Sequence, residues 1–146
     1  MKQLSIDCGV EEFCINGRGV LRFNPSDPNL YTRFLALEER LPTLEEELEK
    51  KTKALEQEDG RVTVLHALEQ ADRELKDWLT EVFGPENDFH QLLQGVNLLA
   101  VAENGQAVVV NLLAALEPIL TEGVERFAES QTRQAVEQAR QRRSML

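Results

Sequence analysis

The sequence predicts a mainly helical (α+β) protein in which an N-terminal β-hairpin or small antiparallel sheet packs on a bundle of about four helices. Through most of the chain, apolar residues recur at spacings of three and four, as in helices with one buried face. Before residue 24, short apolar runs instead flank Asn16-Gly17, a dipeptide typical of tight hairpin turns. The length of 146 residues fits a single domain covering the whole chain, 1–146.

The first 24 residues are the predicted β region. Phe13–Ile15 and Val20–Phe23 are expected to form the two strands of the hairpin, and the alternation in Leu4–Ile6 allows a third strand. A sheet of this size is only marginally stable alone, so we expect it to lie against helices.

A helical bundle is predicted over residues 28–130. It opens at Pro28, with Asp27 as the capping residue. The first stretch carries an apolar seam in a heptad pattern, formed by Leu30, Phe34, Leu37, Leu41, Leu44 and Leu48 and continued by Leu55. Because Pro42 cannot donate to the carbonyl of Glu38, we expect the helix to break near Pro42 and give two helices.

The following helix is predicted from about Val62 to Phe83, where Gly84-Pro85 ends it, and a short helical turn is expected to end at Gly95. Residues 98–110 fit either a second hairpin around Asn104-Gly105 or the start of a helix capped by Asn104. We favour a helix that begins after Gly105 and is kinked near Pro118. Residues 131–146 are predicted to be a polar helix end or tail.

Composition excludes several classes of function. The chain has 26 acidic and 16 basic residues and a net charge of −10, which argues against binding nucleic acid or an anionic membrane surface. The N-terminus lacks the pattern of a signal peptide, so we expect a cytoplasmic protein with Cys8 and Cys14 reduced. Cys14 is expected to be a small core residue of its strand.

No catalytic motif is recognisable in the sequence. It has no phosphate-binding glycine loop and no His-Glu-x-x-His, and the two cysteines are not accompanied by the histidines that a zinc site would need. His66 and His90 are isolated and are expected to be boundary residues. We therefore expect a protein that is not an enzyme and that uses no cofactor or metal.

The candidate protein-binding residues fall into three groups, each with a structural alternative. The leucine seam either packs against the Val62–Phe83 helix or receives an amphipathic helix from a partner or a second copy. Trp78, the only tryptophan, is either a core residue or an interface anchor. The arginines near the C-terminus either complement the helix dipole or form a docking tail for an acidic partner; they are Arg140, Arg142 and Arg143.

Three stretches together resemble the small tail assembly chaperones encoded by long-tailed, siphovirus-type phages and prophages of Gram-positive bacteria. The first is the short β opening that leads through Asn24 into a helix rich in Leu and Glu. The second is Trp78-Leu79-Thr80-Glu81-Val82-Phe83-Gly84-Pro85-Glu86, followed by Leu92-Leu93-Gln94-Gly95-Val96-Asn97-Leu98. The third is the closing helix with its basic end, Gln141-Arg142-Arg143.

The resemblance implies a chaperone that coats the helical, aggregation-prone tape measure protein, helps to recruit tail tube subunits and is absent from the finished virion. The tape measure protein and the tail tube protein would then be its partners, in the cytoplasm of the bacterial host. The alternative function, based on the leucine seam, is a self-associating helical adaptor or regulatory protein that forms homo-oligomers.

Overall fold

The computed structural model describes residues 1–56 and 60–145, with the side chains of Ala54 and Leu55 excepted. The place of Leu55 in the seam therefore lies outside the described side chains. The elements follow the order β1 (Glu11–Ile15), β2 (Gly19–Phe23), α1 (Pro28–Thr52), the 3₁₀ turn η1 (Lys53–Glu56), α2 (Gly60–Phe83), α3 (Phe89–Leu92) and α4 (Val108–Ser144). This arrangement confirms the predicted mainly helical fold with an N-terminal antiparallel hairpin.

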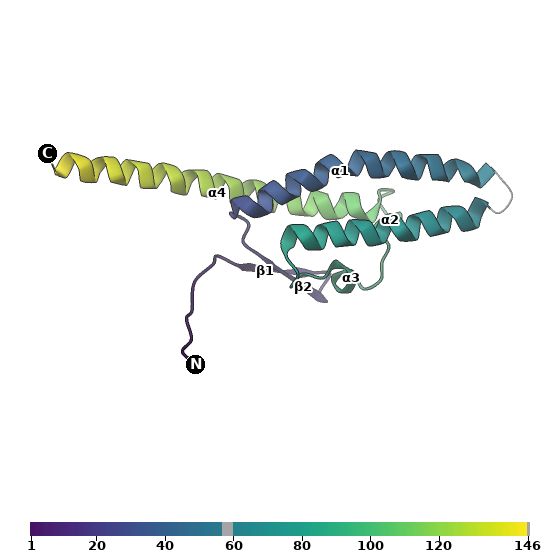
Figure 1. The fold of residues 1–146 in the computed structure, drawn as a ribbon, viewed down its shortest axis with the longest axis horizontal. Coiled ribbons are helices and arrows are strands. Elements are labelled where there is room, and N and C mark those ends of the chain that lie inside the picture. The colour runs from purple at the N-terminus through teal and green to yellow at the C-terminus, as the bar shows by residue number, and fades with distance from the viewer. Residues whose placement is uncertain (57–59, 146) are drawn as a thin grey trace.

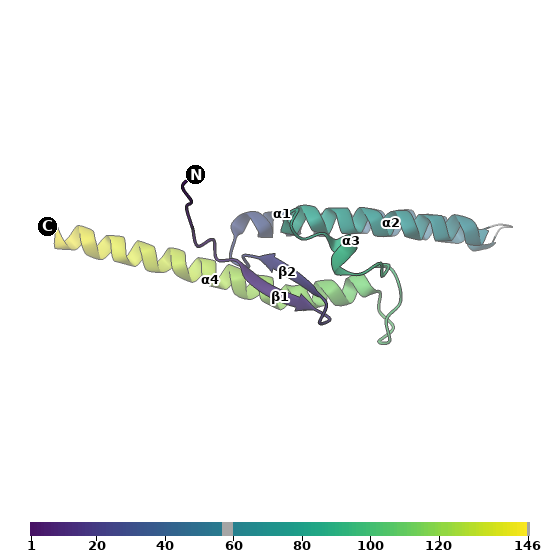
Figure 2. The ribbon, with the colours of Figure 1, turned by 90° about the horizontal axis from the view of Figure 1, so that it is seen from below.

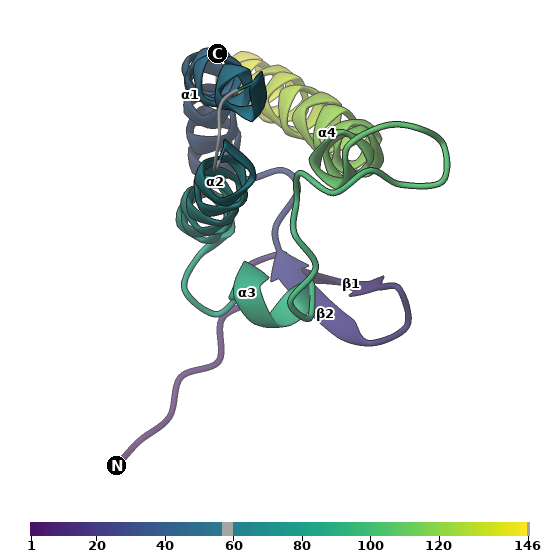
Figure 3. The same cartoon turned by 90° about the vertical axis from the view of Figure 1, so that its right-hand side faces the viewer.

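The hairpin forms where the sequence predicts it. β1 and β2 pair antiparallel, with Ile15 opposite Gly19. Asn16 and Gly17 adopt φ angles of 52° and 73° in the turn, which an asparagine and a glycine tolerate better than other residues do. The predicted third strand at Leu4–Ile6 is wrong, because this segment leads away from the other elements (Figure 3) and its two apolar side chains have no surface to cover them.

The predicted break at Pro42 is also wrong, since α1 is one helix of 25 residues that contains Pro42. Figure 1 shows that α1 bends but stays continuous along α2. Leu37 and Leu44, on either side of Pro42, are both buried. Burying each leucine is worth about 2 kcal/mol, which offsets the cost of about 3 kcal/mol for a proline inside a helix. Pro42 itself lies on the exposed side of α1, away from this packing.

Residues 98–110 combine features of the two predicted alternatives, a second hairpin and the start of a helix. A single antiparallel bridge joins Val101 to Ala107, and α4 then begins at Val108, as the favoured helix requires. The predicted cap is wrong, because Ala107 stands at the N-cap position without a side-chain bond. The Asn104 side chain instead exchanges two hydrogen bonds, of 2.8 and 3.2 Å, with that of Asn111. α4 continues through Pro118 to Ser144, so the polar end is helical.

One hydrophobic core joins the hairpin to the helices. α1 and α2 pack along each other as an antiparallel pair, and α4 runs beside them (Figures 1 and 2). Aromatic rings link the layers: Phe13 stacks on Phe23, Phe23 meets the edge of Phe83, and Phe83 contacts Phe89, at centroid distances of 4.9, 4.9 and 5.6 Å. These contacts hold the sheet against the ends of α2 and α3.

Candidate protein-binding surfaces

The leucine seam of α1 lies mostly inside the molecule. Leu30, Phe34, Leu37 and Leu44 are buried, and Leu41 and Leu48 are half-buried at the edge of the same core. The seam runs along α2, so it matches the alternative in which these residues pack against the Val62–Phe83 helix. In this conformation the four buried side chains are not accessible to another protein.

Trp78 lies half-buried on α2 and packs against the core. The guanidinium of Arg40 on α1 lies over its ring at 5.6 Å from the centroid, a cation–π arrangement. Arg40 also lies 3.7 Å from Glu81. The tryptophan therefore helps to join α1 and α2 at the edge of the core.

The C-terminal arginines lie on the exposed end of α4. Arg140, Arg142 and Arg143 are all exposed, and the last two stand in the final turn, where a positive charge complements the helix dipole. Figure 2 shows this end of α4 extending beyond the rest of the chain. The three arginines are therefore accessible enough either to complement the helix dipole or to dock an acidic partner.

An open apolar groove lies between the hairpin and the first half of α4. Its volume is about 500 Å³, within the range of small-molecule pockets and a suitable size for a few side chains of a partner helix. Its walls carry half-buried or buried apolar side chains, including Phe13, Ile15, Leu93, Val108, Leu112 and Ile119. We call it the hairpin groove. Most of its lining residues are apolar.

The hairpin groove follows from two sequence periodicities that meet only in the folded chain. β1 alternates, so that Phe13 and Ile15 face α4, and α4 presents apolar residues at spacings of three and four. Alternation also explains why the expectation for Cys14 is wrong. Cys14 stands between these two half-buried residues on the strand and is exposed rather than buried in the core.

Asn87 fixes the hairpin wall of the groove and was not singled out from the sequence. Its side chain is 2% exposed. Its Oδ1 accepts from the Arg22 N–H at 2.8 Å, and its Nδ2 donates to the carbonyls of Arg22 and Phe83 at 2.7 and 2.9 Å. The amide thus bonds to the edge of β2 as a neighbouring strand would, and it ties that strand to the end of α2.

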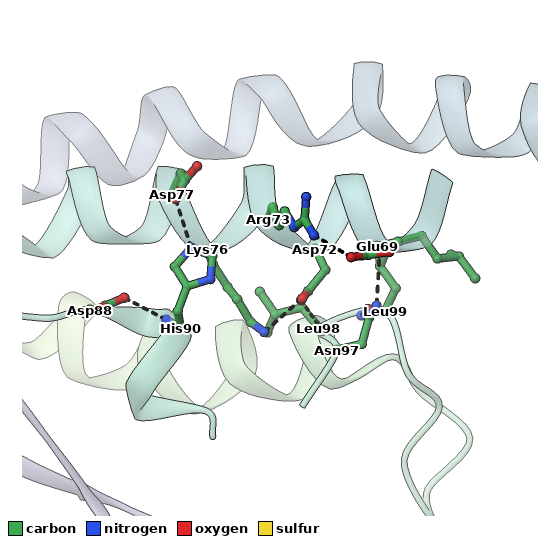
Figure 4. A network of polar contacts seen from close by, with 11 residues as sticks. Glu69, Asp72, Arg73, Lys76, Asp77, Asp88, His90, Asn97, Leu98 and Leu99 are labelled. Atoms are coloured by element: carbon green, nitrogen blue, oxygen red, sulfur yellow. Dashed lines mark hydrogen bonds and ion pairs between the residues drawn. The ribbon is translucent and has the colours of Figure 1, made fainter. Parts of the chain in front are cut away.

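A second set of polar contacts fixes the segment that leads into α4 (Figure 4). Lys76 is a buried cation whose ammonium donates to Asp72 at 2.9 Å, with 3% and 13% of the two side chains exposed. The other oxygen of Asp72 accepts from the Leu98 N–H at 2.8 Å. A buried lysine requires such a partner, and here the pair also fixes residues 97–99 on α2.

The ionisable groups do not form a recognisable catalytic arrangement. His66 is exposed, and His90 is an exposed residue with Nε2 at 2.9 Å from a carboxylate oxygen of Asp77. Within residues 1–56 and 60–145, no three His, Cys, Asp or Glu side chains converge on a point that could hold a metal ion. Cys8 and Cys14 are free thiols, and none of the described helices is long and apolar enough to cross a membrane.

No protein-family model, no curated protein and no solved structure matches the chain.

Proposed function

We propose that this protein is a tail assembly chaperone of a siphovirus-type phage or prophage, which binds and solubilises the tape measure protein and helps to recruit tail tube subunits. The proposal joins the motif resemblance at Trp78–Glu86, Leu92–Leu98 and Gln141–Arg143 to one structural observation. That observation is the open apolar hairpin groove on an otherwise strongly acidic helical protein.

The groove suits a helical client. An apolar stripe on a client helix loses its contact with water by entering a concave apolar surface, and each exposed stripe that is covered removes a site of aggregation. The net charge of −10 then keeps copies on one client apart and the complex in solution. We also propose that the protein is not an enzyme, that it acts in the cytoplasm of the host and that it is absent from the mature virion.

Co-expression with the candidate tape measure protein tests this function. The gene for a tail tube protein is expected upstream and the gene for a very long helical protein downstream, which identifies the client. We expect the client to be soluble with this protein and to aggregate without it. Absence of both genes from the neighbourhood would contradict the proposal.

A matched pair of variants tests the groove. Ala115 and Ala114 are adjacent exposed residues of α4, and only Ala115 lines the hairpin groove. We expect Ala115→Glu to place a charge in the groove and to reduce the soluble client severalfold, while Ala114→Glu leaves it unchanged. Equal solubility with both variants would show that the client binds elsewhere.

The alternative function, a helical adaptor that self-associates through the leucine seam, has less support. Its central residues, including Leu37 and Leu44, are packed inside this chain against α2. Self-association through them would require α1 and α2 to separate.

A further inference from the structure

The C-terminal half of α4 is a helix without a supporting surface. Every residue from 125 to 145 is exposed, and Figures 1 and 2 show this end extending past the other elements. Beyond Arg126, no hydrogen bond or ion pair joins it to another element of the described chain. Because most of the stability of a helix in a protein comes from tertiary packing, this unsupported length of helix is expected to gain stability from a partner.

The last part of this helix is basic in an acidic protein. Residues 131–146 contain four arginines and one glutamate, whereas the chain as a whole has a charge of −10. Arg133, Val136, Arg140 and Arg143 follow one another at spacings of three, four and three, so they share one face of α4. We call this face the basic tail face. Its central apolar residue, Val136, is 48% exposed.

A groove of opposite charge lies between α1 and α4. Its volume is about 460 Å³, and the apolar side chains of its lining that stay at least partly exposed include Leu35, Leu41 and Leu113. Glu38 and Glu45 stand along its α1 side and Glu117 on its α4 side. None of these three carboxylates is paired with a basic side chain among the described residues. We call this feature the acidic groove; it is separate from the hairpin groove, on another side of α4.

The two surfaces match in spacing as well as in charge. Glu38, Leu41 and Glu45 follow at spacings of three and four, as Arg133, Val136 and Arg140 do. Charges seven residues apart lie about 10 Å apart along a helix. A tail helix laid parallel to α1 would therefore bring Arg133 to Glu38, Val136 to Leu41 and Arg140 to Glu45.

The tail of the same molecule cannot make this contact. α4 supplies one wall of the acidic groove with residues between Leu113 and Thr121, and the tail continues from that wall in the same helix, away from the groove. The occupant must come from another molecule. We propose that the basic tail face of one copy docks in the acidic groove of a second copy of this chain. This self-association does not rest on the proposed function.

Two full-length charge-reversal variants test the proposal, with association measured by sedimentation over a range of protein concentrations. One carries Arg133→Glu and Arg140→Glu, which makes the tail acidic. The other carries Glu38→Arg and Glu45→Arg, which makes the groove basic. We expect the native chain to associate at low salt and each variant alone to associate at least tenfold more weakly. An equimolar mixture should associate again, since each tail then meets a groove of opposite charge.

A control pair separates docking from a general effect of charge. Glu39 and Glu46 are also exposed on α1 and seven residues apart, but they lie outside the acidic groove. Glu39→Arg with Glu46→Arg changes the net charge equally and should leave association unchanged. A native chain that stays monomeric at all concentrations would overturn the proposal, as would variants that fail to associate in the mixture. Association equally weakened by the control pair would also overturn it.

Discussion

Asn87 shows how much of this fold depends on one buried amide. Its three hydrogen bonds join β2 to the end of α2, and its own side chain is almost completely buried. Asn87→Ala would leave the N–H and the carbonyl of Arg22 without partners, and each unpaired buried group costs about 1–3 kcal/mol. We expect the free energy of unfolding, measured by urea denaturation, to fall by about 2–4 kcal/mol.

The Asn87→Asp variant tests the two donated hydrogen bonds separately from the accepted one. Aspartate has the same shape and still accepts from the Arg22 N–H, but it cannot donate to the two carbonyls. We expect it to destabilise the protein as well. A loss below about 0.5 kcal/mol in both variants, the scale of an ordinary surface substitution, would contradict the role given to Asn87.

The sequence could not have identified this residue. Asn87 stands in Gly84-Pro85-Glu86-Asn87-Asp88, where an asparagine is expected in a turn and exposed. Its burial depends on Arg22, which is 65 residues away along the chain. The pairing of Lys76 with Asp72 is different, because a spacing of four on a helix is visible in the sequence. Only its burial required the structure.

At the scale of elements, periodicity predicted most of the fold. The hairpin, the start of α1 at Pro28, the end of α2 at Phe83 and the short helix before Gly95 agree with the sequence expectations. The errors arose where tertiary packing decides the outcome: Leu4–Ile6 has no neighbour to pair with, and the turn around Pro42 is held in a helix by its packing. The chain stays helical through Pro42 because α2 buries both sides of that turn, which no local pattern reveals.

Gly123 controls how closely α4 approaches the start of α1. A Cβ at this position would lie 1.9 Å from the carbonyl oxygen of Pro25, which is backbone and cannot move aside as a flexible side chain could. We expect Gly123→Ala to lower the free energy of unfolding by about 1–3 kcal/mol through overpacking. Helix propensity alone would instead raise stability by about 1 kcal/mol.

A second substitution on the same helix provides the comparison for Gly123. Ser130 is exposed on α4, so Ser130→Ala should keep or slightly raise stability. Thermal unfolding followed by circular dichroism measures both. If Gly123→Ala stabilised the protein to the same degree as Ser130→Ala, the close contact with Pro25 would not exist in solution.

At the scale of the whole molecule, the two grooves lie on different sides of α4 and could not be found from one helix at a time. The leucine seam was one of three groups of candidate protein-binding residues in the sequence, with packing against the Val62–Phe83 helix as its structural alternative. The structure shows that its length reflects the α1–α2 contact, with four of its residues buried. The apolar residues that remain open come from several elements, and their convergence depends on tertiary packing.

The division between a packed core and a free tail predicts an uneven distribution of local stability. Residues 71–83 of α2 hold much of the core, whereas residues 125–145 of α4 are exposed throughout. In a dilute sample at high salt, where attraction between opposite charges is screened, we expect amide hydrogens in 125–145 to exchange at least a hundredfold faster than those in 71–83. Hydrogen exchange read by mass spectrometry measures both segments at once.

The dependence of hydrogen exchange on protein concentration tests the proposed self-association. If the tail docks in the acidic groove of a second copy, raising the protein concentration at low salt should slow exchange in 131–145 and in the α1 segment 31–45 together. The same change should leave residues 71–83 as they were, since the core exists in the single chain. A tail that is already protected in the dilute sample at high salt would mean that α4 is supported within one molecule, contrary to its exposure in this structure.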